Sequence, residues 1–243
     1  MVICERLGTT RRHAQRIVRI SAVLSMLMLG PWAMNPALSS NPDDERPSNH
    51  VNGPAEKPRL PYVDAETADP AQREFFDRLR TNGREPLNLH RIWAHSPELL
   101  ASGGRFAVSL RTGTVAARTH VELAIIRATQ LSGGDYEEMQ HRTMAAACGL
   151  TPNQISAIAD WRSSDLFDSE QRAILGWTEG LFRDAGPTDV EFSLMESAFF
   201  SPREIVEITA AASTYAGFSM FTKALRVPLE ADAGKAMGSN PTC

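Results

Sequence analysis

The sequence predicts an all-α fold, and three observations support that class. Apolar residues from about position 62 onward recur at helical spacing, whereas runs of β-branched residues that alternate with polar ones are scarce. Cap residues are repeatedly followed by proline, which is tolerated at a helix start because the first N–H groups lack intrahelical partners. Glycines interrupt the chain where periodic runs end. A chain of 243 residues is long enough for one well-buried domain.

The helix boundaries follow from these signals. Cap–proline pairs occur at Asp69–Pro70, Ser96–Pro97, Thr151–Pro152 and Ser201–Pro202. Capping boxes mark three starts: Thr151 with Gln154, Thr188 with Glu191, and Ser201 with Glu204. We predict helices over residues 69–82, 86–95, 97–111, 116–131, 135–148, 151–160, 169–184, 188–199 and 202–224. Gly133 and Gly134 separate the fourth helix from the fifth, and Gly149 ends the fifth.

The first 39 residues have the features of a secretory signal peptide. Five arginines precede an apolar run over residues 20–29, which is too short to span a bilayer. Ala37 and Ser39 offer small residues for cleavage after Ser39. We therefore expect a periplasmic or secreted protein with no stable membrane span after cleavage. A misplaced start codon, with a true start at one of the later methionines, would give a cytoplasmic product instead. Arg11–Arg12 matches a twin-arginine signal only in part.

The remaining chain divides by composition. Residues 40–61 are rich in Pro, Asn, Asp and Ser and are predicted to be a linker. Residues 62–231 form the predicted helical domain, and residues 232–243 a flexible tail. Without residues 1–39, which hold five Arg and one Glu, the chain keeps 20 basic and 28 acidic residues. This acidic balance gives no basic patch for nucleic acid, so no nucleic-acid partner is expected.

Three cysteines do not make a disulfide framework. Cys4 would leave with the signal peptide, and Cys148 is expected to be a small core residue at a helix end. A bond between Cys148 and Cys243 is conceivable in an oxidising compartment, but the sequence does not give their separation.

Glu122, Glu137 and His141 form the candidate proton-transfer group. Glu137 and His141 are four residues apart and share a helix face. Glu122 lies in an apolar run on the preceding helix, where an unpartnered carboxylate would be costly to bury. An antiparallel helix pair would bring it to His141, and carboxylates around an imidazole can transfer protons. The alternative for Glu137 and His141 is a solvated surface pair without catalytic role.

The spacing of Glu122, Gly134, Glu137 and His141 resembles the alkylhydroperoxidase D-like (AhpD-like) and carboxymuconolactone decarboxylase family. Peroxidase members of that family carry Glu-x11-Cys-x2-Cys-x3-His, and both cysteine positions are changed here. The segment over residues 133–141, GGDYEEMQH, is similar to the branch without cysteines, although Glu138 replaces its usual Trp. The resemblance extends over about residues 60–230.

The resemblance implies an AhpD-like helical bundle and a cofactor-free acid–base enzyme of lyase, decarboxylase or isomerase type. Its substrate would be a small oxo-acid, lactone or unsaturated carbonyl compound, with His141 as acid or base, Glu137 as its partner and Glu122 as the group that orients it. Tyr136 would donate a hydrogen bond to a developing enolate oxygen. Gly134, Glu138 and Tyr215 would shape the substrate pocket. Family members assemble as trimers or hexamers, which implies a homo-oligomer.

Two other functions stay open on the sequence. A hydroperoxide-reducing activity would need a thiolate, which only Cys148 or Cys243 could supply. A non-catalytic oligomer that binds a small molecule would use the acid–base residues only as a buried polar network. No phosphate-binding loop or nucleophilic serine motif is present. No cofactor or metal is expected, although Glu122 could complete a set of two carboxylates and one histidine for a metal.

Overall fold

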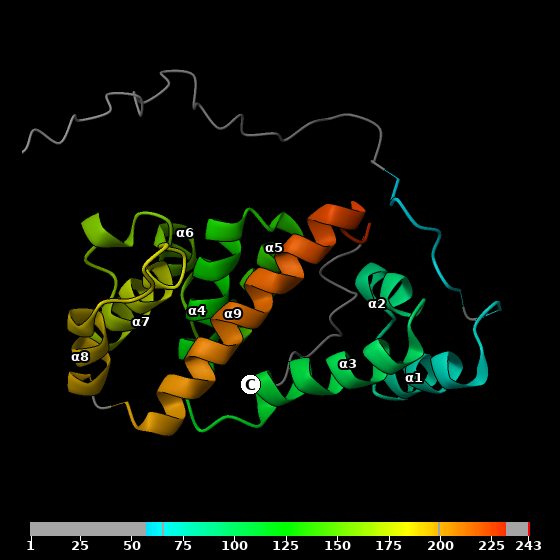
Figure 1. The fold of residues 1–243 in the computed structure, drawn as a ribbon, viewed down its shortest axis with the longest axis horizontal. Helices are drawn as coiled ribbons and strands as arrows, with labels where there is room; N and C mark the ends of the chain where they lie inside the picture. Colours follow the sequence, from blue (N-terminus) through cyan, green and yellow to red (C-terminus); the bar gives the residue numbers. More distant parts are fainter. Residues whose placement is uncertain (1–56, 65, 199, 232–242) are drawn as a thin grey trace, which may run out of the picture. The chain divides into compact units, whose positions relative to one another are not determined.

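The computed structural model describes residues 57–64, 66–198, 200–231 and 243. In these residues each regular secondary-structure element is a helix, and turns and loops connect them (Figure 1). The helices are α1 (Pro70–Thr81), α2 (Asn88–Trp93), α3 (Pro97–Thr112), α4 (Arg118–Ser132), α5 (Asp135–Ala147), α6 (Pro152–Ala157), α7 (Ser169–Gly180), α8 (Asp189–Ser197) and α9 (Pro202–Leu225), with a 3₁₀ turn, η1 (Trp161–Ser163). The predicted all-α class is confirmed, and each predicted helix is present within a few residues of its expected bounds. The 3₁₀ turn was not predicted. None of the helices in the described ranges is long and apolar enough to cross a membrane.

Helix starts use the predicted caps. The side chains of Thr151, Thr188 and Ser201 accept hydrogen bonds from the backbone N–H three residues on, and each capping box is complete. Asp69 and Asp168 form two further boxes that were not predicted, with Gln72 and Gln171. Ser96 precedes Pro97 as expected, but its side chain makes no cap hydrogen bond.

Helix α4 is the centre of the core, since it packs against α9, α5 and α7. Its apolar side chains are buried on nearly all sides, and Figure 1 shows α9 running the length of this group. Close approach of α5 and α9 depends on Gly134, because a Cβ there would lie 2.0 Å from the Oγ atom of Ser219. Gly133 ends α4 with a left-handed backbone, φ 63°. The acidic run on α5 therefore begins directly against α9.

Helices α1, α2 and α3 form a smaller apolar cluster of their own around Phe76, Ala94 and Leu100. The segment after α9 joins this cluster to α5. Glu230 accepts hydrogen bonds from the Tyr136 hydroxyl at 2.6 Å and from the Gln140 amide at 2.6 Å. The backbone N–H of Asn88, at the start of α2, donates to the same carboxylate at 2.7 Å. This polar junction fixes α2 over the N-terminal part of α5.

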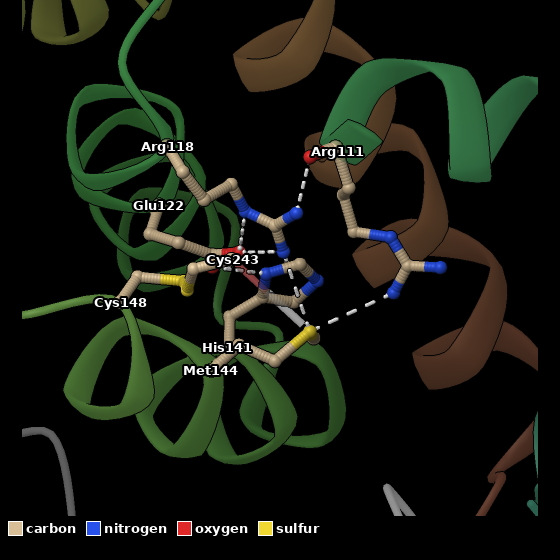
Figure 2. The surroundings of a disulfide bond; sticks show 7 residues. All are labelled: Arg111, Arg118, Glu122, His141, Met144, Cys148 and Cys243. Atoms are coloured by element: carbon tan, nitrogen blue, oxygen red, sulfur yellow. Dashed lines mark hydrogen bonds and ion pairs between the residues drawn. A yellow bond between two sulfur atoms is a disulfide. The ribbon is translucent and has the colours of Figure 1, made fainter. Parts of the chain in front are cut away.

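Cys148 and Cys243 form a disulfide, with their Cα atoms 5.2 Å apart. Cys148 is the C-cap of α5 and is half-buried, so it lies at the end of the helix that carries Glu137 and His141. The bond ties the last residue of the chain to α5 (Figure 2). The rest of the predicted tail, residues 232–242, lies outside the described residues, as do the predicted signal peptide and most of the predicted linker.

Candidate active site

A cavity of about 420 Å³ lies among α1, α2, α3, α5 and α9. Its walls are mainly apolar and aromatic, with Phe75, Leu79, Trp93, Tyr215 and Phe218 among the lining residues. Polar side chains enter the lining from α5, which contributes Glu137, Gln140 and His141. A mostly apolar pocket with a few convergent polar groups is the usual form of a small-molecule site.

His141 is held by Glu122, as the sequence predicted. Its Nδ1 atom lies 2.6 Å from Oε2 of Glu122, and both side chains are buried. The other carboxylate oxygen of Glu122 accepts from Nε of Arg118 at 2.8 Å and also from Nη2 of the same guanidinium. The partly buried Arg118 and the buried Glu122 and His141 thus form a chain of hydrogen-bonded charged and polar groups (Figure 2).

The surroundings of these three side chains favour an ionised Glu122 next to a neutral His141. Burial alone would raise the pKa of Glu122, but His141 and Arg118 lower it below its usual value. Burial lowers the pKa of His141, and the opposing effect of Glu122 is not enough to restore it. Because the ionised Glu122 accepts a hydrogen bond from the Nδ1–H group of His141, the Nε2 atom of His141 carries the basic lone pair. The imidazole ring lines the cavity.

Glu137 is buried in the cavity wall in a different electrostatic setting. Its side chain is 4% exposed, and among the described residues its Oε1 atom has no hydrogen-bond partner. Burial raises the pKa of Glu137 to about 8, with Arg111 opposing the shift and Glu230 adding to it. Glu137 is therefore protonated at neutral pH and can donate a proton, while His141, one helical turn away, can accept one.

Tyr215 reaches the same place from α9. Its ring meets the His141 ring edge to face, with centroids 4.3 Å apart, and it lines the cavity. Burial raises the pKa of its hydroxyl to about 12, so the phenol stays protonated. Tyr215 was predicted to shape the pocket, and the structure places it there.

Tyr136 was predicted to donate to a substrate oxygen, but in the structure its hydroxyl donates to a protein side chain. Its ring lines the cavity, but its O–H donates to Glu230 at 2.6 Å. Its hydroxyl oxygen accepts from the backbone N–H of Leu89 at 3.3 Å. Through these two hydrogen bonds, the Tyr136 hydroxyl connects α5 with α2 and with the segment after α9. Glu230 is 94 residues away in sequence, so no local pattern shows this contact.

Gly134 and Glu138 were predicted to line the pocket, and neither is among the residues that do so. Gly134 contacts Ser219, so its role is the close packing of α5 on α9. Glu138 pairs with Arg142 at 3.0 Å and accepts from Gln130 at 3.1 Å. It lies on a helix face that does not point into the cavity.

Three arginines around the site were missed by the sequence analysis. Arg118 could have been found, because it precedes Glu122 by four residues on the same helix and so shares a face with it. Arg111, at the end of α3, and Arg84, between α1 and α2, line the cavity. Their approach depends on how α1 to α3 pack, which spacing does not reveal. His90 also lines the cavity, where burial lowers its pKa to about 3 and keeps it neutral.

Comparison with known proteins supports the resemblance predicted from the motif. Residues 105–180, which carry Arg111, Arg118, Glu122, Glu137 and His141, match the model of the carboxymuconolactone decarboxylase family. This match, together with the AhpD-like fold of the solved structures described next, supports a carboxymuconolactone decarboxylase-like, AhpD-like family for this chain. No curated protein sequence matches it.

Solved structures with this fold are distant in sequence. An AhpD-core, peroxidase-related protein from Ralstonia eutropha JMP134 has a TM-score of 0.66 and 12% identity, covering 75% of this chain and 96% of its own. A peroxidase-related protein from Silicibacter sp. TM1040 has a TM-score of 0.64 and 17% identity, covering 74% and 97%. The debrominase Bmp8, as a variant in complex with 2,3,4-tribromopyrrole, has a TM-score of 0.61 and 17% identity, covering 72% and 92%. At these identities the likeness establishes the fold and leaves the reaction open.

Proposed function

We propose that the cavity is the active site of a cofactor-free acid–base enzyme acting on a small oxo-acid, lactone or unsaturated carbonyl compound. One arrangement carries this proposal: Glu137, whose Oε1 atom has no hydrogen-bond partner in the described part of the chain, and the His141 imidazole line the same apolar cavity. Burial raises the pKa of Glu137 to about 8, so its carboxyl is the acid of the pair. Two titratable groups whose surroundings give them opposite protonation states define an acid and a base.

The geometry suits proton transfer next to a carbonyl group. His141 would take a proton through Nε2, while Glu122 holds the ring and stabilises the imidazolium that forms. Arg118 keeps Glu122 ionised, so the carboxylate does not itself take the proton. Glu137 would protonate the oxygen or carbon that becomes negative, and the Tyr215 hydroxyl lies on the same wall. Positioned groups of this kind typically contribute about 10²- to 10⁴-fold in rate.

The family match supports a lyase or decarboxylase reaction, and an isomerase would use the same proton transfers. The complex of debrominase Bmp8 with a brominated pyrrole supports a small ring as ligand, because that protein has the same fold. A hydroperoxide-reducing activity has less support. Cys148 and Cys243 are bonded to each other, and neither is among the residues that line the cavity.

Export and self-association remain parts of the proposal. The disulfide between Cys148 and Cys243 supports an oxidising compartment, as the predicted signal peptide would require. Cell fractionation, with the mass of the mature chain, tests export. Light scattering tests the expected homo-oligomer, for which a trimer or hexamer is predicted by resemblance.

The test of the proposed site is ligand-induced stabilisation. The protein from Ser40 onward would be melted against a panel of small oxo-acids, lactones and quinones, and compared with a Glu137→Gln, His141→Gln variant. A ligand at a hundredfold excess over its dissociation constant stabilises the fold by about 2.7 kcal/mol. Glu138→Gln serves as the control, since Glu138 lies on the same helix outside the cavity.

A ligand whose effect is lost in the double variant and kept in Glu138→Gln would support the site and name a substrate class. Ligands that stabilise all three proteins equally would locate binding elsewhere. That result would favour the reading in which the polar cluster has no catalytic role.

A further inference from the structure

Arg84 and Arg111 have cationic side chains for which the described residues provide no counterion at the cavity. Both are half-buried and both line the cavity. Within the described part of the chain, neither guanidinium makes an ion pair with a carboxylate. Arg111 donates through Nε to the carbonyl of Ala107 at 3.2 Å. Figure 2 shows its other contact, from Nη1 to the Met144 sulfur at 3.6 Å. These weak partners do not neutralise its charge.

The two arginines lie close enough to act on each other. Burial lowers the pKa of Arg84, and the positive charges of Arg111 and Arg118 lower it further. A guanidinium nevertheless stays charged in proteins. Partly removing two like charges from water without a counterion is unfavourable, and a bound anion would relieve that cost.

The charge of the cavity contrasts with the charge of the chain. Beyond residue 39 the sequence holds 20 basic and 28 acidic residues, yet the cavity lining includes Arg78, Arg84, Arg105 and Arg111. Its one carboxyl is Glu137, which burial keeps protonated at neutral pH. The ionised groups of the lining are therefore cations, and they would concentrate an anion that the acidic surface repels.

From this arrangement we infer that Arg84 and Arg111 form an anion clamp that binds a carboxylate of the ligand, so that the cavity selects apolar or aromatic carboxylic acids over their neutral analogues. The planar guanidinium fork matches a carboxylate in geometry as well as charge. The inference rests on the proposed function in taking the cavity as the substrate site, and it adds the substrate's charge and the residues that select it.

The position of Arg111 also says where the carboxylate would lie. Its charge acts on the pKa values of Glu137, His141 and Tyr215, so it lies near all three. A carboxylate on Arg111 would therefore sit beside the proton-transfer groups, with the apolar part of the ligand against the aromatic walls. Arg84 lies outside the segment that matches the family model, so the clamp combines a family segment with the loop between α1 and α2.

Isothermal titration with paired probes tests the clamp. The acids are phenylacetate and cinnamate, and their uncharged counterparts are phenylacetamide and cinnamamide, which keep shape and size. Arg84→Gln and Arg111→Gln remove one charge each, and Arg73→Gln removes an exposed arginine of α1 outside the cavity. Circular dichroism and the melting temperature of each variant check that it folds.

We expect each acid to bind the wild type at least tenfold more tightly than its amide. Arg84→Gln and Arg111→Gln should each weaken acid binding about 10- to 100-fold, the range for a hydrogen bond to a charged group. Amide binding should be unchanged, and Arg73→Gln should behave as wild type.

Equal binding of acids and amides, no acid binding at millimolar concentration, or unchanged acid binding in both cavity variants would overturn the inference. Binding is measured without turnover, so these outcomes leave the acid–base proposal standing. Conversely, a His141→Gln variant with unaltered turnover would remove that proposal without touching the clamp.

Discussion

Replacing Glu137 by Gln should remove the pH dependence that this buried carboxyl imposes on the stability of the fold. The folded pKa of Glu137 is about 8, against an ordinary value of 4.5. Between these values the unfolded chain releases a proton that the folded chain keeps, so the folded state loses stability as pH rises. Each pH unit in that window costs about 1.4 kcal/mol, which gives a total of about 5 kcal/mol. The full stabilising effect is present below pH 4.5 and is lost by about pH 8.

Urea unfolding of wild type and Glu137→Gln from pH 4.5 to 8.5 measures this contribution. The difference between the two proteins at each pH cancels the groups that titrate alike in both. We expect the free energy of unfolding of Glu137→Gln, relative to wild type, to rise by several kcal/mol between pH 4.5 and about pH 8. Glu138→Gln, which removes a partly exposed ion pair with Arg142, should differ from wild type by less than about 1 kcal/mol. A difference for Glu137→Gln that is flat with pH, or that falls as pH rises, would refute a neutral buried carboxyl.

Three further outcomes follow from the packing. Glu122→Ala should lower the free energy of unfolding by about 3 to 5 kcal/mol, because Arg118 and His141 lose the buried carboxylate that they share. A loss of less than about 1 kcal/mol in urea unfolding would contradict this expectation. Reducing the disulfide between Cys148 and Cys243, which are 95 residues apart, should lower the free energy of unfolding by about 2 to 4 kcal/mol. This typical range lies below the ~4.7 kcal/mol that chain entropy alone gives for a loop of about 100 residues. Equal melting of reduced and oxidised protein would argue against the bond. Gly134→Ala should destabilise the fold by about 1 to 3 kcal/mol, because the added Cβ would clash with Ser219 on α9. Gly217→Ala on α9 has open space around it and should be neutral or stabilising. Equal effects of the two substitutions would show that the structure relieves the clash at Gly134.

The helices could be predicted from the sequence because their signals are local. Thr151, Thr188 and Ser201 each meet a partner three residues away, so cap and helix start are encoded in one short segment. The 3₁₀ turn at Trp161–Ser163 was missed because a single turn has no periodicity to detect. The sequence did not decide whether Cys148 and Cys243 form a disulfide, because the two cysteines are distant in sequence and only the folded chain brings them together.

The candidate site was predicted where adjacent helices build it. Glu122 and His141 meet because α4 and α5 are joined by a tight glycine turn, so sequence spacing translates into a contact. The hydrogen bond from Tyr136 to Glu230 was not foreseen, because Glu230 comes from the other end of the domain. Arg84 was missed because α1 and α2 reach the cavity through tertiary packing, which leaves no motif.

Proton transfer by His141 in the cavity is the central step of the proposed function. The decisive measurement is the rate at which solvent deuterium enters a ligand found by the stabilisation panel, followed by proton NMR in D₂O for wild type, His141→Gln and Glu138→Gln. We expect exchange or turnover by the wild type and by Glu138→Gln, and a rate about 10²- to 10⁴-fold lower for His141→Gln with its fold intact. An equal rate in all three proteins would contradict the acid–base role assigned to this site.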